Sequence, residues 1–242
     1  MTDDPNNIMR AESDDDLLLA ALLKQSGTAP AAALPGIPRR QPDAFVPLTF
    51  AQESLWFLWR LDPAGTAYTI PAAARLRGRL DANALQTALR QIVSRHEILR
   101  TVFRETDGHA GQVILPASGP AVDVEDLRQM PQCDQEQAAH ERMRQEALKP
   151  FDLERGPLLR ILLLQLGAPE GECRDHILVL TLHHIVADAW SVEIFVRELA
   201  GAYGAALRGE TPALAPLPIQ YADYAVWQRQ ALTEERMRRQ IA

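Results

Sequence analysis

Hydrophobic residues recur along the chain at two different spacings, and these spacings predict alternating helices and strands. Apolar residues three and four positions apart are typical of a helix that packs one face on a core, whereas short apolar runs between turn-forming residues are typical of buried strands. Helices are expected at residues 17–23, 50–59, after Asp81, at 135–148, from 191 and from 221. Strands are expected at residues 72–80, 98–103, 112–115, 158–166 and 177–182. Such interleaving indicates an α/β or α+β sandwich.

Caps and turns refine this pattern. Asp81 is a favourable N-cap for the helix that follows it, and Ser191 is expected to cap the helix after the last buried strand. The dipeptide Asp107-Gly108 predicts a turn that pairs strand 98–103 with strand 112–115. The helix expected from residue 191 has an apolar stripe of Val192, Phe195, Val196, Leu199 and Tyr203.

The chain divides into three parts by composition. Residues 1–45 hold a short apolar helix, capped by Ser13, and an Ala/Pro-rich stretch (28–47) that reads as a semi-rigid linker. Residues 46–210 form the folded body, and residues 211–242 form a Pro-rich connector and a final helix with a charged tail. The segment 1–45 is either a docking element for another protein or a linker whose helix packs locally.

Overall composition excludes several classes of function. The 242 residues are 47% hydrophobic and 24% charged, which suits a large globular core, and the net charge of −7 argues against nucleic acid as a partner. The longest apolar runs are too short to cross a membrane, and the acidic N-terminus does not resemble a secretory signal. Cys133 and Cys173 lie far apart, with neither a disulfide framework nor a metal spacing, so we expect free thiols and a cytoplasmic protein.

Two adjacent histidines, His183 and His184, directly follow the strand expected at 177–182. They are the strongest candidates for chemistry. Imidazole changes protonation near neutral pH, so a neutral ring held at a fixed point can accept a proton from an attacking nucleophile. Successive side chains of a strand point to opposite faces, so one ring is expected to face a reaction and the other to support the loop. Binding of a metal is the alternative, with Asp188 or His176 as the third ligand.

Asp188 follows the pair by four residues and has two interpretations. It could orient the imidazole directly, or it could form a buried ion pair that holds the loop. Arg95 and Arg100 are candidate partners, because they flank the point where a helix is expected to meet a strand. The alternative is that these two arginines lie on a solvated helix end.

Several segments together resemble the condensation domains of non-ribosomal peptide synthetases. Residues 48–63 (LTFAQESLWFLWRLDP) are similar to the first motif of that family, and 95–103 (RHEILRTVF) to its second. Residues 183–191 (HHIVADAWS) resemble its signature of two histidines, three residues and Asp-Gly. Residues 221–228 (YADYAVWQ) match its fourth motif, and residues 150–160 (PFDLERGPLLR) are also similar. The resemblance covers about residues 46–242, and the first two motifs are most similar to the subclass that joins two L-configured residues.

The resemblance implies one lobe of a fold similar to chloramphenicol acetyltransferase, with a mixed sheet flanked by helices. It also implies amide formation between donor and acceptor thioesters, which carrier proteins bring in on phosphopantetheine, with no cofactor or metal bound by the domain. His184 is then the active histidine, His183 supports the loop, and Asp188 pairs with Arg95. Implied partners are the two carrier proteins, an adjacent adenylation domain and, through residues 1–45, an upstream subunit.

Two departures from the family pattern change these expectations. Ala189 replaces the signature glycine, ahead of Trp190 and Ser191; alanine adopts a positive φ at a cost of about 1 kcal/mol, so we expect it to be tolerated. The second lobe of the family domain lies outside the sequence, so the 242 residues alone are expected to be inactive. Alternative functions are a related acyltransferase that uses a freely diffusing acceptor, and a non-catalytic module that recruits partner proteins.

Overall fold

The computed structural model describes residues 36–41, 44–170, 173–212 and 214–232. The chain separates into two units, Met1–Gly36 and Ile37–Ala242, and the second holds all the helices and strands described below. The helix expected at 17–23, half of the predicted linker and the charged tail after residue 232 lie outside the described residues.

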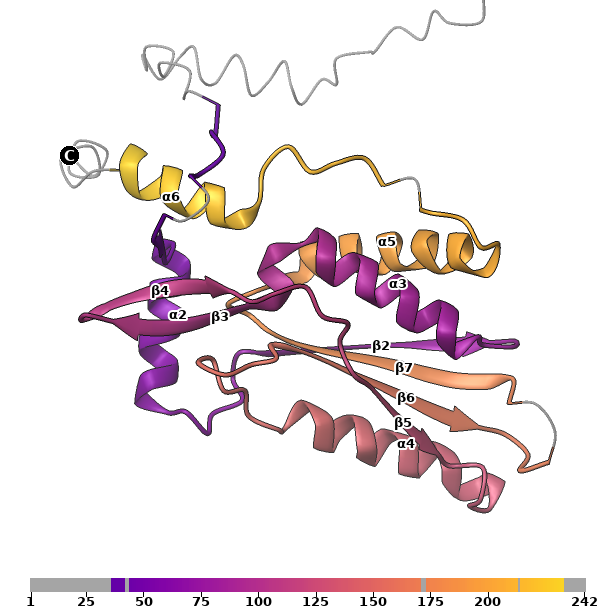
Figure 1. Ribbon diagram of the computed structural model, residues 1–242. Coiled ribbons are helices and arrows are strands. Elements are labelled where there is room, and N and C mark those ends of the chain that lie inside the picture. Colours follow the sequence, from indigo (N-terminus) through magenta and orange to yellow (C-terminus); the bar gives the residue numbers. More distant parts are fainter. Residues whose placement is uncertain (1–35, 42–43, 171–172, 213, 233–242) are drawn as a thin grey trace, which may run out of the picture. The chain divides into compact units, whose positions relative to one another are not determined.

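A four-stranded sheet forms the centre of the second unit (Figure 1). Its strands, in spatial order, are β2 (Thr69–Arg77), β7 (Asp175–His183), β6 (Leu159–Leu166) and β5 (Val122–Asp126). The first three pair antiparallel and β5 joins β6 in parallel, so the sheet is mixed, as the family resemblance implied.

Helices cover both faces of this sheet, which explains why its central strands are almost continuously apolar. On one face, α3 (Ala82–Arg95) and α5 (Ala189–Leu207) pack on alternate strand residues such as Leu163 and Leu180. On the opposite face, α4 (Gln132–Ala147) packs on the intervening residues, such as Leu164 and Val179. The core therefore consists of two apolar layers separated by the sheet.

A smaller sheet lies beside the first and carries the start of the folded chain. Its order is β1 (Val46–Pro47), β4 (His109–Ile114) and β3 (Thr101–Thr106). Asp107 and Gly108 have φ values of 51° and 76°, which fits a primed turn between β3 and β4 and confirms the predicted hairpin.

Two helices connect the smaller sheet to the rest of the unit. Trp56 of α2 (Phe50–Leu61) packs in one apolar cluster with Phe103 of β3 and with Ile185, just after β7. Helix α6 (Tyr221–Ala231) packs two alanines against Val46 of β1.

Several predictions about local structure were wrong. The strand expected at 72–80 is Thr69–Arg77, and β5 was not predicted. Residues Glu97–Arg100 form a short 3-10 helix, η1, and β3 begins only at Thr101; the Thr101 hydroxyl donates to the Glu97 carbonyl at 2.8 Å and closes that turn. The N-cap of α5 is Asp188, three residues before Ser191. Val196 belongs to the exposed side of α5, with 44% of its surface accessible, and so lies outside the buried stripe.

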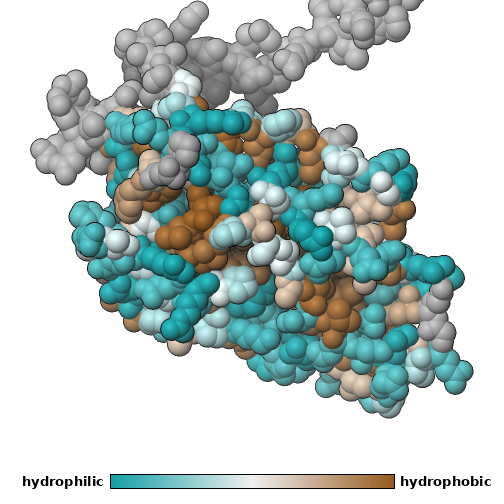
Figure 2. Space-filling model, viewed as in Figure 1, coloured by the Kyte–Doolittle hydropathy of each residue, from teal (hydrophilic) through white to brown (hydrophobic). Residues whose placement is uncertain are grey.

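Part of the segment predicted to be a linker belongs to the folded unit. Residues 46 and 47 form β1, and Arg39 and Arg40 bond to residues near α6. Elsewhere on the surface, hydrophobic side chains gather in separate areas among hydrophilic ones on the face that Figure 2 shows. Phe57 and Leu61 of α2 are among the exposed apolar residues.

Candidate active site

A cleft of about 360 Å³ opens at the carboxyl end of β7. Its lining residues come from α2, the end of β7 and the loop after it, η1 and the residue before it, α5, and the first residue of α6. They are Ala51, Leu55, His96, Ile98, Leu99, Leu182, His184, Ile185, Val186, Ala187, Asp188, Ser191, Ile194, Phe195 and Tyr221. The walls are mainly apolar, and two imidazoles are among the few polar groups that they present.

His184 is the histidine of the pair that lines this cleft, and its side chain is exposed. Its backbone N–H donates to the Tyr68 carbonyl at 2.8 Å, which extends the pairing of β2 with β7 by one residue. The backbone of His184 is therefore fixed by the sheet. Among the described residues, no side chain hydrogen-bonds to its ring, so both ring nitrogens are available to a ligand.

His183 points to the other side and is 5% exposed. Its Nδ1 accepts the Ile185 N–H at 3.1 Å, and the ring meets Phe151 edge to face at a centroid distance of 5.9 Å. Burial, and to a lesser extent the neighbouring charge of His184, lowers the pKa of His183 to about 4. His183 is thus a neutral ring that shapes the loop from behind.

Asp188 fixes the far end of that loop as the N-cap of α5. Its Oδ1 accepts the Ser191 N–H at 2.8 Å and also accepts the Ser191 hydroxyl. These two bonds hold the pKa of Asp188 below its usual range, so the carboxylate is ionised at the positive end of the helix. Oδ1 of Asp188 is therefore occupied by contacts with the first turn of α5.

The expected ion pair between Asp188 and Arg95 does not form. Arg95 Nε lies 3.3 Å from Glu198 Oε2, and its Nη1 donates to the Ala215 carbonyl at 2.6 Å. The end of α3 therefore lies beside the middle of α5 and away from its N-terminus. Arg100, the other candidate, donates to the Leu115 carbonyl and lies 3.9 Å from Glu97, and the described residues show no ion pair between it and Asp188.

The remaining signature residues, Ala189, Trp190 and Ser191, form the first turn of α5. Ala189 is the first residue of α5 and is not among the described residues with positive φ, of which Asp107 is the one non-glycine. The glycine of the family signature is therefore unnecessary for this backbone. Trp190 is 72% exposed, and Ser191 lines the cleft.

His96 is a cleft residue that the sequence did not identify. Its Nε2 lies 2.7 Å from Glu198 Oε2, and the ring lines the cleft together with His184. His96 stands within the segment 95–103 that resembles the second family motif, but its carboxylate partner is 102 residues away in sequence. No local spacing connects the two.

Metal binding by the histidine pair does not fit the geometry. His176, a proposed third ligand, is the second residue of β7, whereas His183 is the last, and seven strand residues span roughly 23 Å. Within the described ranges no group of three or more His, Cys, Asp or Glu residues is placed to hold a metal.

The same part of the chain contains no helix with the length and apolar character needed to cross a membrane.

The capping role of Asp188 predicts a small, local effect of its removal. Asp188→Ala should lower the free energy of unfolding by about 1 kcal/mol, and Asp188→Asn, which retains an acceptor, by a few tenths at most. Loss of one member of a buried ion pair would instead cost about 3–5 kcal/mol. Urea unfolding of both variants, of Arg95→Met, and of Asp188→Ala combined with Arg95→Met distinguishes the two cases. We expect the effects of Asp188→Ala and Arg95→Met to add, and a strong coupling would contradict the structure.

Comparisons with known proteins identify the family of this chain. The family profile for the condensation domain matches residues 43–242. One of the proteins that make up the linear gramicidin synthase of Brevibacillus parabrevis is 45% identical over 224 residues, which are 93% of this chain and 3% of that protein. Phosphinothricin tripeptide synthetase PhsC of Streptomyces viridochromogenes is 42% identical over 212 residues, which are 86% of this chain and 19% of that protein.

Solved structures show the same fold. The X-domain from teicoplanin biosynthesis has a TM-score of 0.73 and 36% identity, and the match covers 84% of this chain and 42% of that one. The starter condensation domain of rhizomide synthetase has a TM-score of 0.69 and 25% identity over 81% of this chain and 46% of that one. The chain thus spans less than half the length of these structures and a small part of the two synthetases.

Proposed function

The chain belongs to the condensation-domain family of non-ribosomal peptide synthetases, and from that premise we propose that the His184 cleft is where an amide bond forms. The observation that carries the proposal is the position of one imidazole. It stands at the end of a core strand, exposed to an apolar cleft, with its backbone bonded to the neighbouring strand.

The proposed reaction joins an acceptor amine to a donor acyl group. The amine nitrogen attacks the carbonyl carbon of the donor thioester; the C–N bond forms, the C–S bond breaks, and the donor thiol leaves with a proton. His184 accepts a hydrogen bond from the attacking amine, takes up its proton as the nitrogen becomes an amide, and passes that same proton to the departing sulfur. His183 and Asp188 act indirectly, since they hold the two ends of the loop between β7 and α5.

Both substrates would arrive on phosphopantetheine arms of carrier proteins, one for the donor and one for the acceptor. An adjacent adenylation domain would load the acceptor carrier. Docking of an upstream subunit through residues 1–45 remains a prediction, because that segment lies almost wholly outside the described residues. The apolar cleft walls suit an acyl chain and a pantetheine arm better than a charged ligand.

A second candidate function follows from the structural match to the X-domain. That domain has also been solved in a complex with OxyB, so a protein of this fold can bind a partner enzyme. By analogy, this chain could be part of a recruiting module. The exposed His184 ring in an open cleft favours catalysis over recruitment.

The direct test is mass spectrometry of products formed by the complete domain with loaded donor and acceptor carriers. Amide product on the acceptor carrier supports the proposal. A free ester or amide of a diffusing acceptor would indicate the related acyltransferase, and capture of a partner enzyme without any product would indicate the recruiting module.

We expect the 242 residues alone to form no amide in the same assay. They cover 42–46% of the solved domains described above, so a large share of the walls around the substrates is absent from this stretch. Addition of the complete domain to the same carriers is the positive control. Product from the 242 residues at a rate within tenfold of the complete domain would contradict this prediction.

A further inference from the structure

We infer that Arg40 is a positioning residue of the cleft, which holds two of its walls together from behind. Arg40 precedes the first residue that the condensation-domain profile matches, residue 43, and it lies in the segment that the sequence predicts to be a linker. The inference about catalysis rests on the proposed function. The structural tie, by which we mean the contacts of Arg40 with η1 and α6, stands independently of it.

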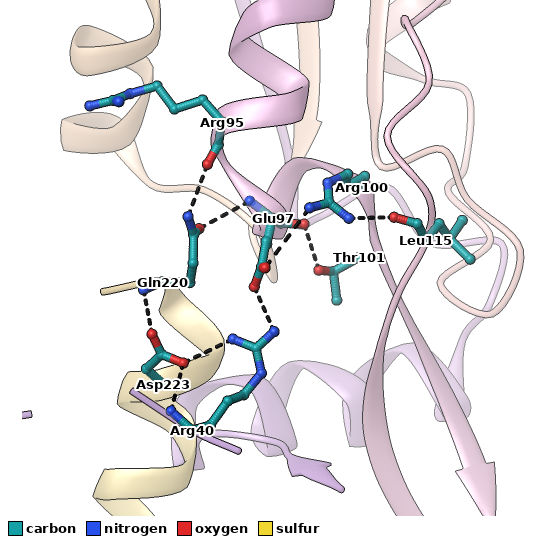
Figure 3. Close-up of polar contacts among 8 residues, drawn as sticks. All are labelled: Arg40, Arg95, Glu97, Arg100, Thr101, Leu115, Gln220 and Asp223. Atoms are coloured by element: carbon teal, nitrogen blue, oxygen red, sulfur yellow. Dashed lines mark hydrogen bonds and ion pairs between the residues drawn. The ribbon is translucent and has the colours of Figure 1, made fainter. Parts of the chain in front are cut away.

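The guanidinium of Arg40 bridges two carboxylates from different elements (Figure 3). Its Nη2 donates to Glu97 Oε2 at 2.8 Å, and its Nη1 donates to Asp223 Oδ1 at 2.9 Å. The backbone N–H of Arg40 also donates to Asp223 Oδ1 at 3.2 Å. The three side chains are only 14%, 21% and 4% exposed for Arg40, Glu97 and Asp223, so water screens these pairs far less than it screens surface pairs.

Each carboxylate belongs to an element that lines the cleft. Glu97 begins η1, and the next two residues, Ile98 and Leu99, are cleft residues. Asp223 lies in the first turn of α6, two residues after the cleft residue Tyr221. A shift of either carboxylate would therefore move a wall of the cleft.

Gln220 adds a second connection between the same two elements, drawn beside the first in Figure 3. Its side-chain amide donates to the Arg95 carbonyl at 3.0 Å and accepts the Glu97 N–H at 3.1 Å. The Gln220 side chain is neutral and bonds to backbone groups. Among the residues of this cluster, Arg40 is the one cation that pairs with both Glu97 and Asp223.

The protonation of Asp223 agrees with a charged cluster. Burial alone would raise its pKa, but hydrogen bonds from Gln220 and Arg40 outweigh burial and keep the pKa below its usual range. Removal of Arg40 would leave Asp223 without its cation and Glu97 with Arg100 alone, at 3.9 Å, so we expect the two carboxylates to move apart.

The neighbouring Arg39 provides a matched control. Its side chain donates to the Pro218 and Leu217 carbonyls, at 2.9 and 3.0 Å, so it ties the same segment to the loop before α6. These bonds are exposed and do not involve η1. Arg39→Met therefore removes an equal charge and two bonds without releasing Glu97.

The test compares Arg40→Met, Arg40→Lys, Glu97→Gln and Arg39→Met in the complete domain by the carrier assay. Arg40→Met should lower kcat on the order of tenfold and change the KM for the acceptor carrier less than twofold, since a displaced wall disturbs alignment in the bound state. Arg40→Lys should recover part of kcat, and Arg39→Met should stay within twofold of the parent. Glu97→Gln keeps the Arg40–Asp223 pair and removes the negative charge of η1 that faces Arg40, so it should lower kcat in the same direction as Arg40→Met.

Hydrogen exchange in the 242-residue chain supplies a readout that needs no substrate. The amide of Glu97 should exchange at least tenfold faster in Arg40→Met and Glu97→Gln than in Arg39→Met. If the complete parent domain forms no amide product but exchange in the 242-residue variants changes in this way, the proposed function falls and the structural tie stands. A folded Arg40→Met with parental kcat, or an equal loss in Arg39→Met, overturns the inference; if Arg40→Met does not fold, an unchanged Glu97→Gln overturns it.

Discussion

Replacement of His184 by alanine in the complete domain should lower kcat for amide formation on the order of 10³-fold, within the range that a positioned acid–base group contributes. The ring is exposed in the cleft and its backbone is held by the bond to Tyr68, so the variant should lose the imidazole without disturbing the strand. The KM for each loaded carrier should change little, because carrier docking does not depend on this ring. Single-turnover assays followed by mass spectrometry measure the effect.

His140→Ala is the matched control for this prediction. His140 lies exposed on α4, where its Nδ1 is 2.7 Å from the Glu136 carbonyl, on the opposite side of the sheet from α5. It should leave kcat unchanged. A His184→Ala variant that keeps kcat within tenfold of the parent would show that another group promotes the reaction.

Acidification should weaken the fold through His183, by up to about 3 kcal/mol. The pKa of His183 is about 4 in the folded chain against 6.5 for the ordinary side chain. Between these values the unfolded chain binds a proton that the folded chain does not. The free energy of unfolding therefore keeps the full contribution above about pH 6.5 and loses it as pH falls towards 4.

Urea unfolding at pH 7 and pH 5 tests this effect, with His183→Asn as the reference. Asparagine retains an acceptor for the Ile185 N–H but does not titrate, so its stability should vary less over this range than that of the parent. Burial also lowers the pKa of His176, and both proteins share that contribution, so it cancels in the comparison. An equal acid-induced loss in parent and variant would contradict the neutral, buried state of His183.

Much of the fold could be predicted because it depends on local pattern. The apolar runs of β6 and β7 reflect a sheet covered on both faces, and Asp81 caps α3 through a bond to the Ala84 N–H at 2.9 Å. The Asp-Gly turn set the register of β3 with β4. The prediction that the rings of His183 and His184 face opposite sides also followed from local pattern, because successive side chains of a strand alternate between its two faces.

The errors came from features with more than one local solution. Aspartate and serine are equally good N-caps, so the sequence allows α5 to begin after either Asp188 or Ser191. In the structure Asp188 is the N-cap. Ile98 and Leu99 are adjacent apolar residues that suit a strand, but in η1 they reach two different apolar clusters.

Long-range ion pairs could not be predicted from spacing. Arg95 had a plausible partner in Asp188, yet it lies beside Glu198, which the packing of α3 on α5 brings closer. Arg40 pairs with carboxylates 57 and 183 residues further along the chain. Only the assembled fold brings these groups together, so the second imidazole of the cleft and the ties behind its walls are structural findings.

The central claim is that reacting groups meet beside His184, and nuclear magnetic resonance of histidine-labelled complete domain tests it most directly. The probe is a stable amide analogue of an aminoacyl-pantetheine, added in increasing amounts. The predicted result is a saturable shift of the His184 ring signals, with a smaller shift of His96 and none for His140. An analogue that binds but leaves the His184 signals unchanged would contradict the account.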